Sequence, residues 1–372
     1  MTTETKEANL PLRIAIMVTL ALSVLAIVVR SAYGGGFFSR LLELTGLKEE
    51  ESVVSTYLFS GESFAMCGDK LAVASSVGAA LIDESGASLA AESFVMDAPA
   101  VSASPALSIF YDVGGTALCV ISGIGESILH PTAYPLRFAD ASSDGYITLV
   151  TDVPDYRGRV QVFQSDFSPV FSLDCGISGY PLMARVSPGQ HLVVNCVNSL
   201  GSSLHFYTLT AETELACFEQ EDSLILDFDF LTDGTLAVLT SEALYLMDDS
   251  GKLLSTVDFE GRVLADYCLT GRCAVLLLHD DLTGSRGVLR SYSARGELTG
   301  ELELTESVYS LSVMGRQILV LYPSALTLYH EDFSNDISYQ RVANSTLCLM
   351  AGENKALLLG KSGAELIRFS RK

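Results

Sequence analysis

The sequence predicts an all-β fold, a single β-propeller of eight four-stranded blades, preceded by one N-terminal transmembrane helix. Two observations predict the propeller. Residues 52–372 contain short runs rich in Val, Leu, Ile, Tyr and Phe between Gly, Asp, Asn and Ser turns, without helical apolar spacing. These runs recur in sets roughly 40 residues apart. A third observation predicts the helix, because residues 14–29 carry no charge.

The N-terminal tail, residues 1–13, leads into the predicted transmembrane anchor, residues 14–33. The uncharged run is bracketed by Arg13 and Arg30, whose charged ends can reach the membrane interface. The alternative is a cleaved signal peptide. The preceding residues are not net positive, and no A-x-A cleavage site follows the run, so we favour an uncleaved anchor.

The flanking basic residues do not decide the orientation of the anchor. We place the C-terminal domain outside the cell, because one N-terminal span before a large domain is the usual export arrangement. The expected location is therefore the cell membrane, with a single pass and an extracytoplasmic domain. Residues 34–51 form the predicted linker, with a flexible Gly34–Gly36 break and a short amphipathic helix over Phe37–Leu47.

The repeated unit is an apolar strand, a polar break, a second apolar strand, a turn and a third strand. Its clearest copy is Thr235–Thr256, and Lys70–Leu89 and Ile318–Asp332 resemble it. A shorter strand before each unit completes a set of four, which is the period of a β-propeller. These first strands are predicted near Phe64, Phe94, Arg137, Tyr180, Leu224, Arg262, Val308 and Thr346.

The two ends of the repeat predict a closed ring over residues 52–372. The last copy has three strands and stops at Phe369, while a spare strand, Val53–Phe59, precedes the first full copy. Pairing the two would cover both open sheet edges. We therefore predict eight blades. Seven blades, with the interval from Phe64 to Phe94 as an irregular elaboration, and a two-domain β-sandwich are the alternatives.

Composition excludes some classes of protein. The chain of 372 residues is 49% hydrophobic and 18% charged, which excludes a disordered protein. It has 45 acidic and 23 basic residues, a net charge of −22, and residues 49–372 alone carry −24. This field repels phosphate backbones, so we expect no nucleic-acid partner.

We expect no catalytic, cofactor-binding or metal-binding residues and no cofactor, so the protein is predicted not to be an enzyme. No CxxC, HExxH or GxSxG motif is present. Most cysteines lie in apolar strands and are predicted to be buried thiols, with Cys268 and Cys273 as the best disulfide candidates. The eight are Cys67, Cys119, Cys175, Cys196, Cys217, Cys268, Cys273 and Cys348.

Two further groups of residues have chemistry that we weighed. The histidines are scattered over different repeats and are expected to be structural; they are His130, His191, His205, His279 and His330. Asp227, Asp229 and Asp233 alternate along one strand and run into a turn. Their oxygens could bind Ca²⁺, but the spacing of an EF-hand loop is absent, and chance clustering is the favoured interpretation.

The D-x-x-G turns Asp83–Gly86 and Asp248–Gly251 resemble those of quinoprotein dehydrogenase propellers and of the related outer-membrane assembly lipoproteins. Those repeats place a Trp after the Gly, whereas this chain has Leu89 and Leu254 and no Trp at all. The missing Trp argues against quinone chemistry. Over nearly its whole length, the chain resembles a family of membrane-anchored, extracytoplasmic propellers of unknown function from Gram-positive anaerobic bacteria. That resemblance implies no activity.

These observations favour a membrane-tethered, non-catalytic protein-interaction scaffold. Its partners are the membrane, through the N-terminal helix, and a protein, which the acidic charge predicts to be basic or bridged by cations. The alternative is a carbohydrate-binding or carbohydrate-processing cell-surface protein, in which Tyr would have to replace Trp as the stacking residue. A redox quinoprotein is the third reading.

Overall fold

The computed structural model describes residues 53–58, 61–176, 179–284, 286–334, 336–342, 345–360 and 363–370, with the backbone alone for 53–58. All of them belong to the unit Ser52–Lys372. Every regular element in these ranges is a β-strand. None of the described residues forms a helix that could cross a membrane. The predicted tail, anchor and linker helix, residues 1–51, lie outside the described residues.

The described strands form eight four-stranded antiparallel sheets, which we number as blades 1 to 8. Within each blade, the strands are named from the innermost to the outermost. Blades 1 to 4 are β2 (Ser63–Cys67), β3 (Lys70–Ser75), β4 (Gly78–Ile82), β5 (Ser88–Ser93); β6 (Pro99–Ala103), β7 (Leu107–Asp112), β8 (Leu118–Ser122), β9 (Ser127–Leu129); β10 (Leu136–Ala141), β11 (Ile147–Thr151), β12 (Gly158–Phe163), β13 (Pro169–Cys175); and β14 (Tyr180–Val186), β15 (His191–Asn198), β16 (Gly201–Thr208), β17 (Glu214–Glu221). Blades 5 to 8 are β18 (Ile225–Phe230), β19 (Leu236–Thr240), β20 (Ala243–Met247), β21 (Leu253–Asp258); β22 (Val263–Cys268), β23 (Cys273–His279), β24 (Gly287–Ser293), β25 (Leu298–Glu303); β26 (Ser310–Met314), β27 (Gln317–Leu321), β28 (Leu326–His330), β29 (Ile337–Tyr339); and β30 (Ser345–Gly352), β31 (Lys355–Gly360), β32 (Gly363–Arg368), β1 (Val53–Leu58).

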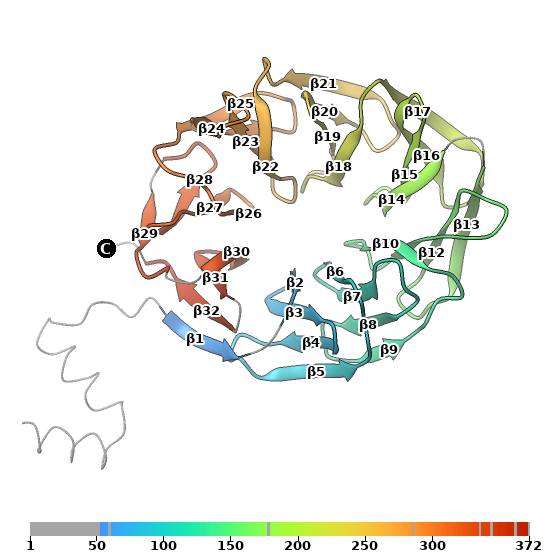
Figure 1. Ribbon diagram of the computed structural model, residues 1–372, viewed down its shortest axis with the longest axis horizontal. Coiled ribbons are helices and arrows are strands. Elements are labelled where there is room, and N and C mark those ends of the chain that lie inside the picture. Colours follow the sequence, from blue (N-terminus) through green and yellow to red (C-terminus); the bar gives the residue numbers. More distant parts are fainter. Residues whose placement is uncertain are drawn as a thin grey trace, which may run out of the picture. The chain divides into compact units, whose positions relative to one another are not determined.

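The blades are arranged as a ring around a central opening, with the first strand of each blade on the inside (Figure 1). The second strands are buried on both faces, as in β7 and β11, which explains why they stand out in the sequence as continuous apolar runs. Outermost strands alternate between exposed and half-buried residues, as in β17 and β21, because only one of their faces meets a neighbouring blade.

The hydrophobic core lies between the blades. Eight clusters of buried residues are present among the described residues, and each joins two adjacent blades. One of them packs Leu71 and Val73 of blade 1 against Leu357 and Leu366 of blade 8. Since a single sheet cannot bury both of its faces, this cyclic packing supplies the apolar contacts that every blade needs.

The ring is closed by strand pairing as well as by packing. β1 from the start of the repeat pairs antiparallel with β32 from its end, with Thr56 opposite Glu365. β1 thereby becomes the outermost strand of blade 8 (Figure 1). The predicted closure and the eight-blade count are confirmed, and the seven-blade and β-sandwich alternatives are wrong.

Turns between third and fourth strands have a common Asp–Gly geometry, and the turn at Gly251 packs against the preceding blade. In the turns at Asp83 and Asp248, the carboxylate accepts hydrogen bonds from backbone N–H groups two and four residues later. The following glycine has a positive φ, 91° at Gly251. Gly251 lies so close to Phe206 of blade 4 that an added Cβ would come within 2.8 Å of its ring.

One predicted first strand is misplaced. The innermost strand of blade 2 begins at Pro99 rather than near Phe94. The segment at Phe94 connects two blades, and its apolar character comes from packing, since Met96 is buried in the core between blades 1 and 2. Pro99 is the first residue of its strand, a position that tolerates proline. The other seven first strands lie within about two residues of the predicted positions.

Candidate functional site

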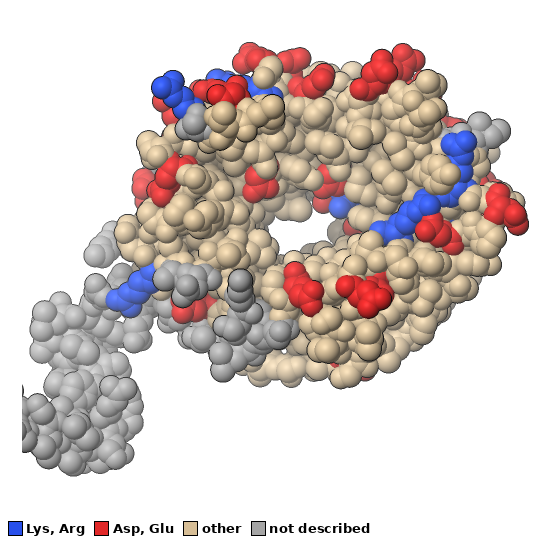
Figure 2. All heavy atoms as spheres, viewed as in Figure 1, with Lys and Arg blue, Asp and Glu red and all other residues tan. Residues whose placement is uncertain are grey.

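The innermost strands of blades 2 to 6 carry polar and charged side chains beside the central opening. Asp and Glu side chains are visible around this opening in Figure 2, and Lys or Arg side chains reach it on one side. We call the connected group the channel cluster, and it consists of Ser102 on β6, Asp140 on β10, Arg185 on β14, Asp227 and Asp229 on β18, and Tyr267 on β22.

Arg185 is the centre of the channel cluster. Its Nε lies 3.3 Å from Asp140 Oδ1, and its Nη1 lies 3.1 Å from Asp227 Oδ1 and 3.9 Å from Asp229 Oδ2. One guanidinium therefore links blade 3, blade 4 and blade 5. The planar group is also enclosed by aromatic rings, with its Cζ 5.5 Å from the centroids of both Phe138 and Phe228.

Further hydrogen bonds hold the carboxylates in place. Ser102 Oγ donates to Asp140 Oδ1 at 3.2 Å, and Tyr267 Oη donates to Asp227 Oδ2 at 3.3 Å. Asp229 Oδ1 accepts the N–H of Phe230 at 2.7 Å. The network thus runs through the innermost strands of five consecutive blades. Asp229 has the longest contact with the guanidinium, and its side chain keeps 29% exposure.

The electrostatics of the channel cluster are unbalanced, with three carboxylates for one guanidinium. Burial raises the pKa of Asp229 to about 6, although Arg185 opposes the change. Burial also raises the pKa of Asp140, against the same opposition. For Arg185, burial alone would lower the pKa, but the carboxylates of Asp229, Asp227 and Asp140 outweigh it and raise the pKa. The channel cluster therefore brings three carboxyl groups and one guanidinium together in a largely desolvated place.

A cluster of this kind can accept a cation. Its two hydroxyl groups, Ser102 and Tyr267, each donate to a carboxylate, and none of its six residues is a histidine that could serve as the base of a nucleophilic triad. The carboxylates could receive the ammonium or guanidinium of a lysine or arginine that enters the opening from solvent. Asp229, which is held least closely by Arg185, is the natural contact point.

The calcium interpretation of the aspartate trio does not fit the structure. The guanidinium of Arg185 lies beside both Asp227 and Asp229, so a positive charge is already present there. Asp233 is in the turn after β18, where its Oδ1 accepts the N–H of Thr235 at 3.0 Å. The three carboxylates are therefore divided between a charge network and a turn.

The histidines lie in separate places, and three of them have evident structural contacts. His130 stacks on Phe167 with centroids 3.9 Å apart. His191 Nδ1 lies 3.0 Å from Asp249 Oδ2, and His330 Nδ1 lies 3.1 Å from Asp332 Oδ1.

His205 is different, because its two ring nitrogens contact a serine hydroxyl and a carboxylate. Its Nε2 is 2.8 Å from Ser203 Oγ and its Nδ1 is 2.9 Å from Glu214 Oε1, the order of a serine triad. Ser203, however, lies inside β16 and is 5% exposed. It is paired with Cys196 on one side and Glu219 on the other. Backbone N–H groups in the middle of a sheet already donate to carbonyl groups of the neighbouring strands, so none is available to stabilise an oxyanion there.

All eight cysteines are free thiols, and six of them are buried, as expected. Cys268 and Cys273, the proposed disulfide candidates, lie on the paired strands β22 and β23 without a bond between them. The thiol of Cys268 instead lies 3.3 Å from Thr270 Oγ1. Cys217, on the outermost strand of blade 4, is exposed.

Sequence reasoning identified Asp227 and Asp229 but missed Arg185 and Asp140. A signal was present. Arg185 follows Asp140 by 45 residues and precedes Asp227 by 42, which is one blade in each case. Charged residues that occupy the first strand of successive repeats must meet beside the opening, so reading the charges in phase with the repeat would have found the group.

Comparison with solved structures confirms the fold. The C-terminal WD40 domain of Sif2 matches with a TM-score of 0.62 and 12% identity, covering 86% of this chain and 98% of that one. BamB from Moraxella catarrhalis, a quinoprotein-like propeller, matches with a TM-score of 0.56 and 10% identity, covering 85% of this chain and 99% of that one. The WD40 domain of SCAP from fission yeast matches with a TM-score of 0.54 and 10% identity, covering 84% of this chain and 96% of that one. At these identities the likeness extends to the fold alone.

No curated protein sequence matches the chain. A family model does match it, over residues 46–369, which is most of the chain and includes every blade. The resemblance to a propeller family without an assigned activity is thereby confirmed. The protein belongs to DUF5711, a family of unknown function.

Proposed function

We propose that this protein is a membrane-tethered, extracytoplasmic propeller that acts as a non-catalytic scaffold and docks a basic segment of a protein partner at its channel. The channel cluster carries this proposal, because Asp140, Asp227 and Asp229 outnumber their single cation, Arg185. An unbalanced group of buried charges lowers stability, and groups of this kind are concentrated at binding and catalytic sites.

The charge of the whole domain supports the same partner. Residues 49–372 carry a net charge of −24, which attracts basic proteins over long distances and raises their association rate. At the channel, a lysine or arginine of the partner would complete the charge balance beside Asp229. The long-range attraction weakens with salt, since the Debye length is about 8 Å at 0.15 M, whereas the partly buried contact is screened less.

The absence of catalysis is supported by the arrangement of reactive groups in the described part of the chain. The channel cluster has no histidine beside its hydroxyl groups, and the Ser203–His205–Glu214 chain has a buried serine in the middle of a sheet. The attachment to the membrane is supported by the uncharged run of residues 14–29.

Binding of a synthetic lysine-rich peptide to the purified full chain tests the docking site. We expect binding that weakens as salt is raised, and a further loss in Asp229→Asn. The matched control is Asp97→Asn, which removes the same charge from an exposed loop residue and should reduce binding only slightly. Equal losses in the two variants would show that net charge alone attracts the peptide, and the docking site would be wrong.

Two experiments on the native protein complete the test. Capture of partners from native membranes at low and high salt should recover a basic protein that is lost at high salt, whereas salt-independent capture or hydrolysis of a neutral glycan would contradict the scaffold. Protease treatment of intact cells or spheroplasts should digest the propeller. Protection until the membrane is lysed would refute the extracytoplasmic orientation.

A further inference from the structure

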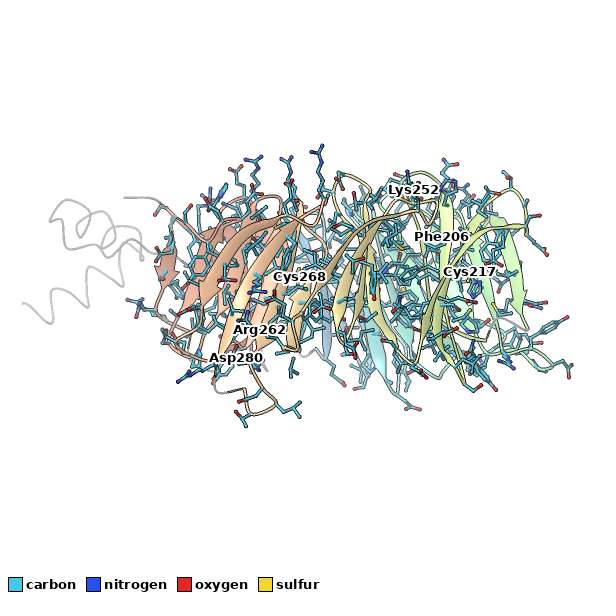
Figure 3. The ribbon with its side chains drawn as sticks, turned by 90° about the horizontal axis from the view of Figure 1, so that it is seen from above. Phe206, Cys217, Lys252, Arg262, Cys268 and Asp280 are labelled. Carbon is cyan, nitrogen blue, oxygen red and sulfur yellow. The ribbon has the colours of Figure 1, made fainter. Side chains whose placement is uncertain are left out.

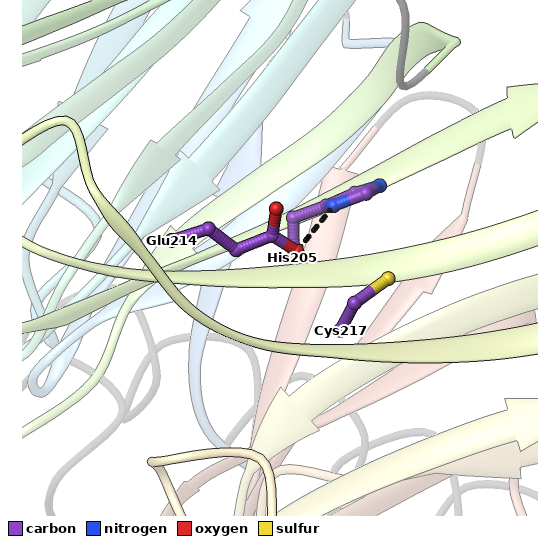
Figure 4. A group of neighbouring side chains, drawn as sticks. All are labelled: His205, Glu214 and Cys217. Carbon is purple, nitrogen blue, oxygen red and sulfur yellow. Dashed lines mark hydrogen bonds and ion pairs between the residues drawn. The ribbon is translucent and has the colours of Figure 1, made fainter.

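The outer part of blade 4 brings three different metal-binding groups to one face of a sheet. β16 and β17 are antiparallel with His205 opposite Cys217. A register shift between Phe206 and Tyr207 places Glu214 opposite Tyr207, and therefore on the face that His205 and Cys217 share. We call Ser203, His205, Glu214 and Cys217 the rim cluster. Figure 4 shows the last three, with the thiol and the carboxylate on the same side as the imidazole.

The distances within the rim cluster are close to those of a metal site. A ligand atom from each of His205, Glu214 and Cys217 lies within 4.8 Å of the other two, and His205 Nδ1 lies 2.9 Å from Glu214 Oε1. Zinc bonds of about 2.0–2.3 Å in a tetrahedron bring ligand atoms to ~3.3–3.8 Å from one another. The widest-spaced ligand atoms therefore need to close by at most about 1–1.5 Å, and His205 Nδ1 and Glu214 Oε1 need to open by about 0.4 Å. Side-chain rotation on an edge strand allows both movements.

We propose that His205, Glu214 and Cys217 form a binding site for a zinc-like divalent metal ion. Their imidazole, carboxylate and thiolate together suit Zn²⁺, since Ca²⁺ and Mg²⁺ take oxygen ligands and Cu(I) prefers sulfur. Three protein ligands leave the fourth tetrahedral position open for water or for a ligand from another molecule.

Ser203 supports this assignment from behind the imidazole. Its Oγ lies 2.8 Å from His205 Nε2. When the hydroxyl accepts the N–H of Nε2, the lone pair of the imidazole is on Nδ1, the nitrogen that faces Glu214. Metal-bound histidines are held by a hydrogen bond of this kind on their other nitrogen. Without metal, Nδ1–H donates to Glu214 Oε1. Metal binding moves this imidazole proton to Nε2, where Ser203 Oγ accepts it, and releases the thiol proton of Cys217 to solvent.

The site is reachable from solvent and is anchored at one ligand. The side chain of His205 is 9% exposed, that of Glu214 is 39% exposed, and Cys217 is exposed on the outermost strand. In Figure 3, Cys217 is seen on a blade different from that of Cys268, the other cysteine that is not buried. A bound ion would tie the edge strand β17 to β16 and strengthen an otherwise half-covered strand.

Titration of the reduced, metal-free full chain in detergent with Co²⁺ tests the proposal, because thiolate-bound cobalt has a near-ultraviolet charge-transfer band. We expect the band to saturate at about one equivalent and to disappear when Zn²⁺ is added. Cys217→Ser should abolish it. Cys268→Ser, the matched control, should leave it unchanged. Ser203→Ala should keep the band and weaken the affinity about 10- to 100-fold.

Three results would overturn the assignment. Absence of the band in the wild-type chain, with circular dichroism showing folded protein, would exclude the site. A band that survives Cys217→Ser would place the metal elsewhere. Labelling of Ser203 by a fluorophosphonate in the metal-free chain would instead assign Ser203, His205 and Glu214 to acyl transfer.

Discussion

Replacing Asp229 by Asn should make the propeller more stable at neutral pH. The carboxyl is largely buried beside Asp140 and Asp227, and Arg185 compensates only part of this negative charge. Burial raises its pKa from the ordinary 3.8 to about 6. Because each pKa unit corresponds to about 1.4 kcal/mol, ionised Asp229 lowers the free energy of unfolding by about 2–3 kcal/mol at pH 7.

The pH dependence gives this prediction its sign. Between pH 3.8 and about 6, the folded state holds the Asp229 proton more tightly than the unfolded state does. The wild-type chain therefore loses stability as the pH rises through this window, and Asp229→Asn does not share this loss. The difference in unfolding free energy between the two should be near zero at pH 4 and should grow to about 2–3 kcal/mol in favour of Asn at pH 7.

Urea unfolding of the full chain, followed by circular dichroism at several pH values, measures this difference. Asp97→Asn, on an exposed loop, is the control and should stay within about 0.5 kcal/mol of wild type. The reasoning would be refuted if Asp229→Asn were less stable than wild type at pH 7. It would also be refuted if the gain in unfolding free energy were the same at every pH. A stabilised variant that also loses peptide binding would show that the charge is kept for binding at the expense of stability.

Three further predictions concern the same framework. A chain that begins at residue 62 lacks β1 and should lose stability throughout the ring, so a melting temperature equal to that of the full chain would contradict closure. Gly251→Ala should lower the free energy of unfolding, measured with urea, by about 2–5 kcal/mol, because Ala would adopt a positive φ and clash with Phe206. Gly234→Ala, at a φ of 88° but with open space around it, should lower it by only about 1–2 kcal/mol. Equal losses in the two variants would contradict the packing argument. Arg185→Met should cost about 3–5 kcal/mol at pH 7, because it leaves buried carboxylates unpaired, and less at pH 4; a cost that does not fall at pH 4 would contradict this origin.

The fold was predictable because the strands that define it are buried on both sides. β11 and β19 have no exposed residue, so their apolar runs mark each repeat independently of tertiary context. The innermost strands are harder, since they contact the opening on one edge and carry mixed residues. Pro99–Ala103 was missed for this reason, and its proline argues against a strand in sequence alone.

The sites were less predictable, because each is made by residues that only the folding brings together. Arg185 meets Asp140 across 45 residues, so its partners can be found only by comparing positions one repeat apart and not from the residues around it. Cys217 lies directly opposite His205, but Glu214 comes to share their face only through the register shift at Tyr207. A one-residue shift exchanges the two faces of a strand, so no spacing rule applied to the sequence could have grouped these three residues.

The strand that closes the ring also determines the order in which the blades can be completed during folding. β1 is synthesised before every blade, yet its partner β32 lies about 300 residues later, with Leu58 opposite Gly363. At a synthesis rate of about 5–20 residues per second, the wait lasts roughly 15–60 s. During that time β1 has an unpaired edge that can join strands of other chains. Blade 8 is thus the last to be completed, and folding of the newly made chain requires that this first strand be kept from premature pairing.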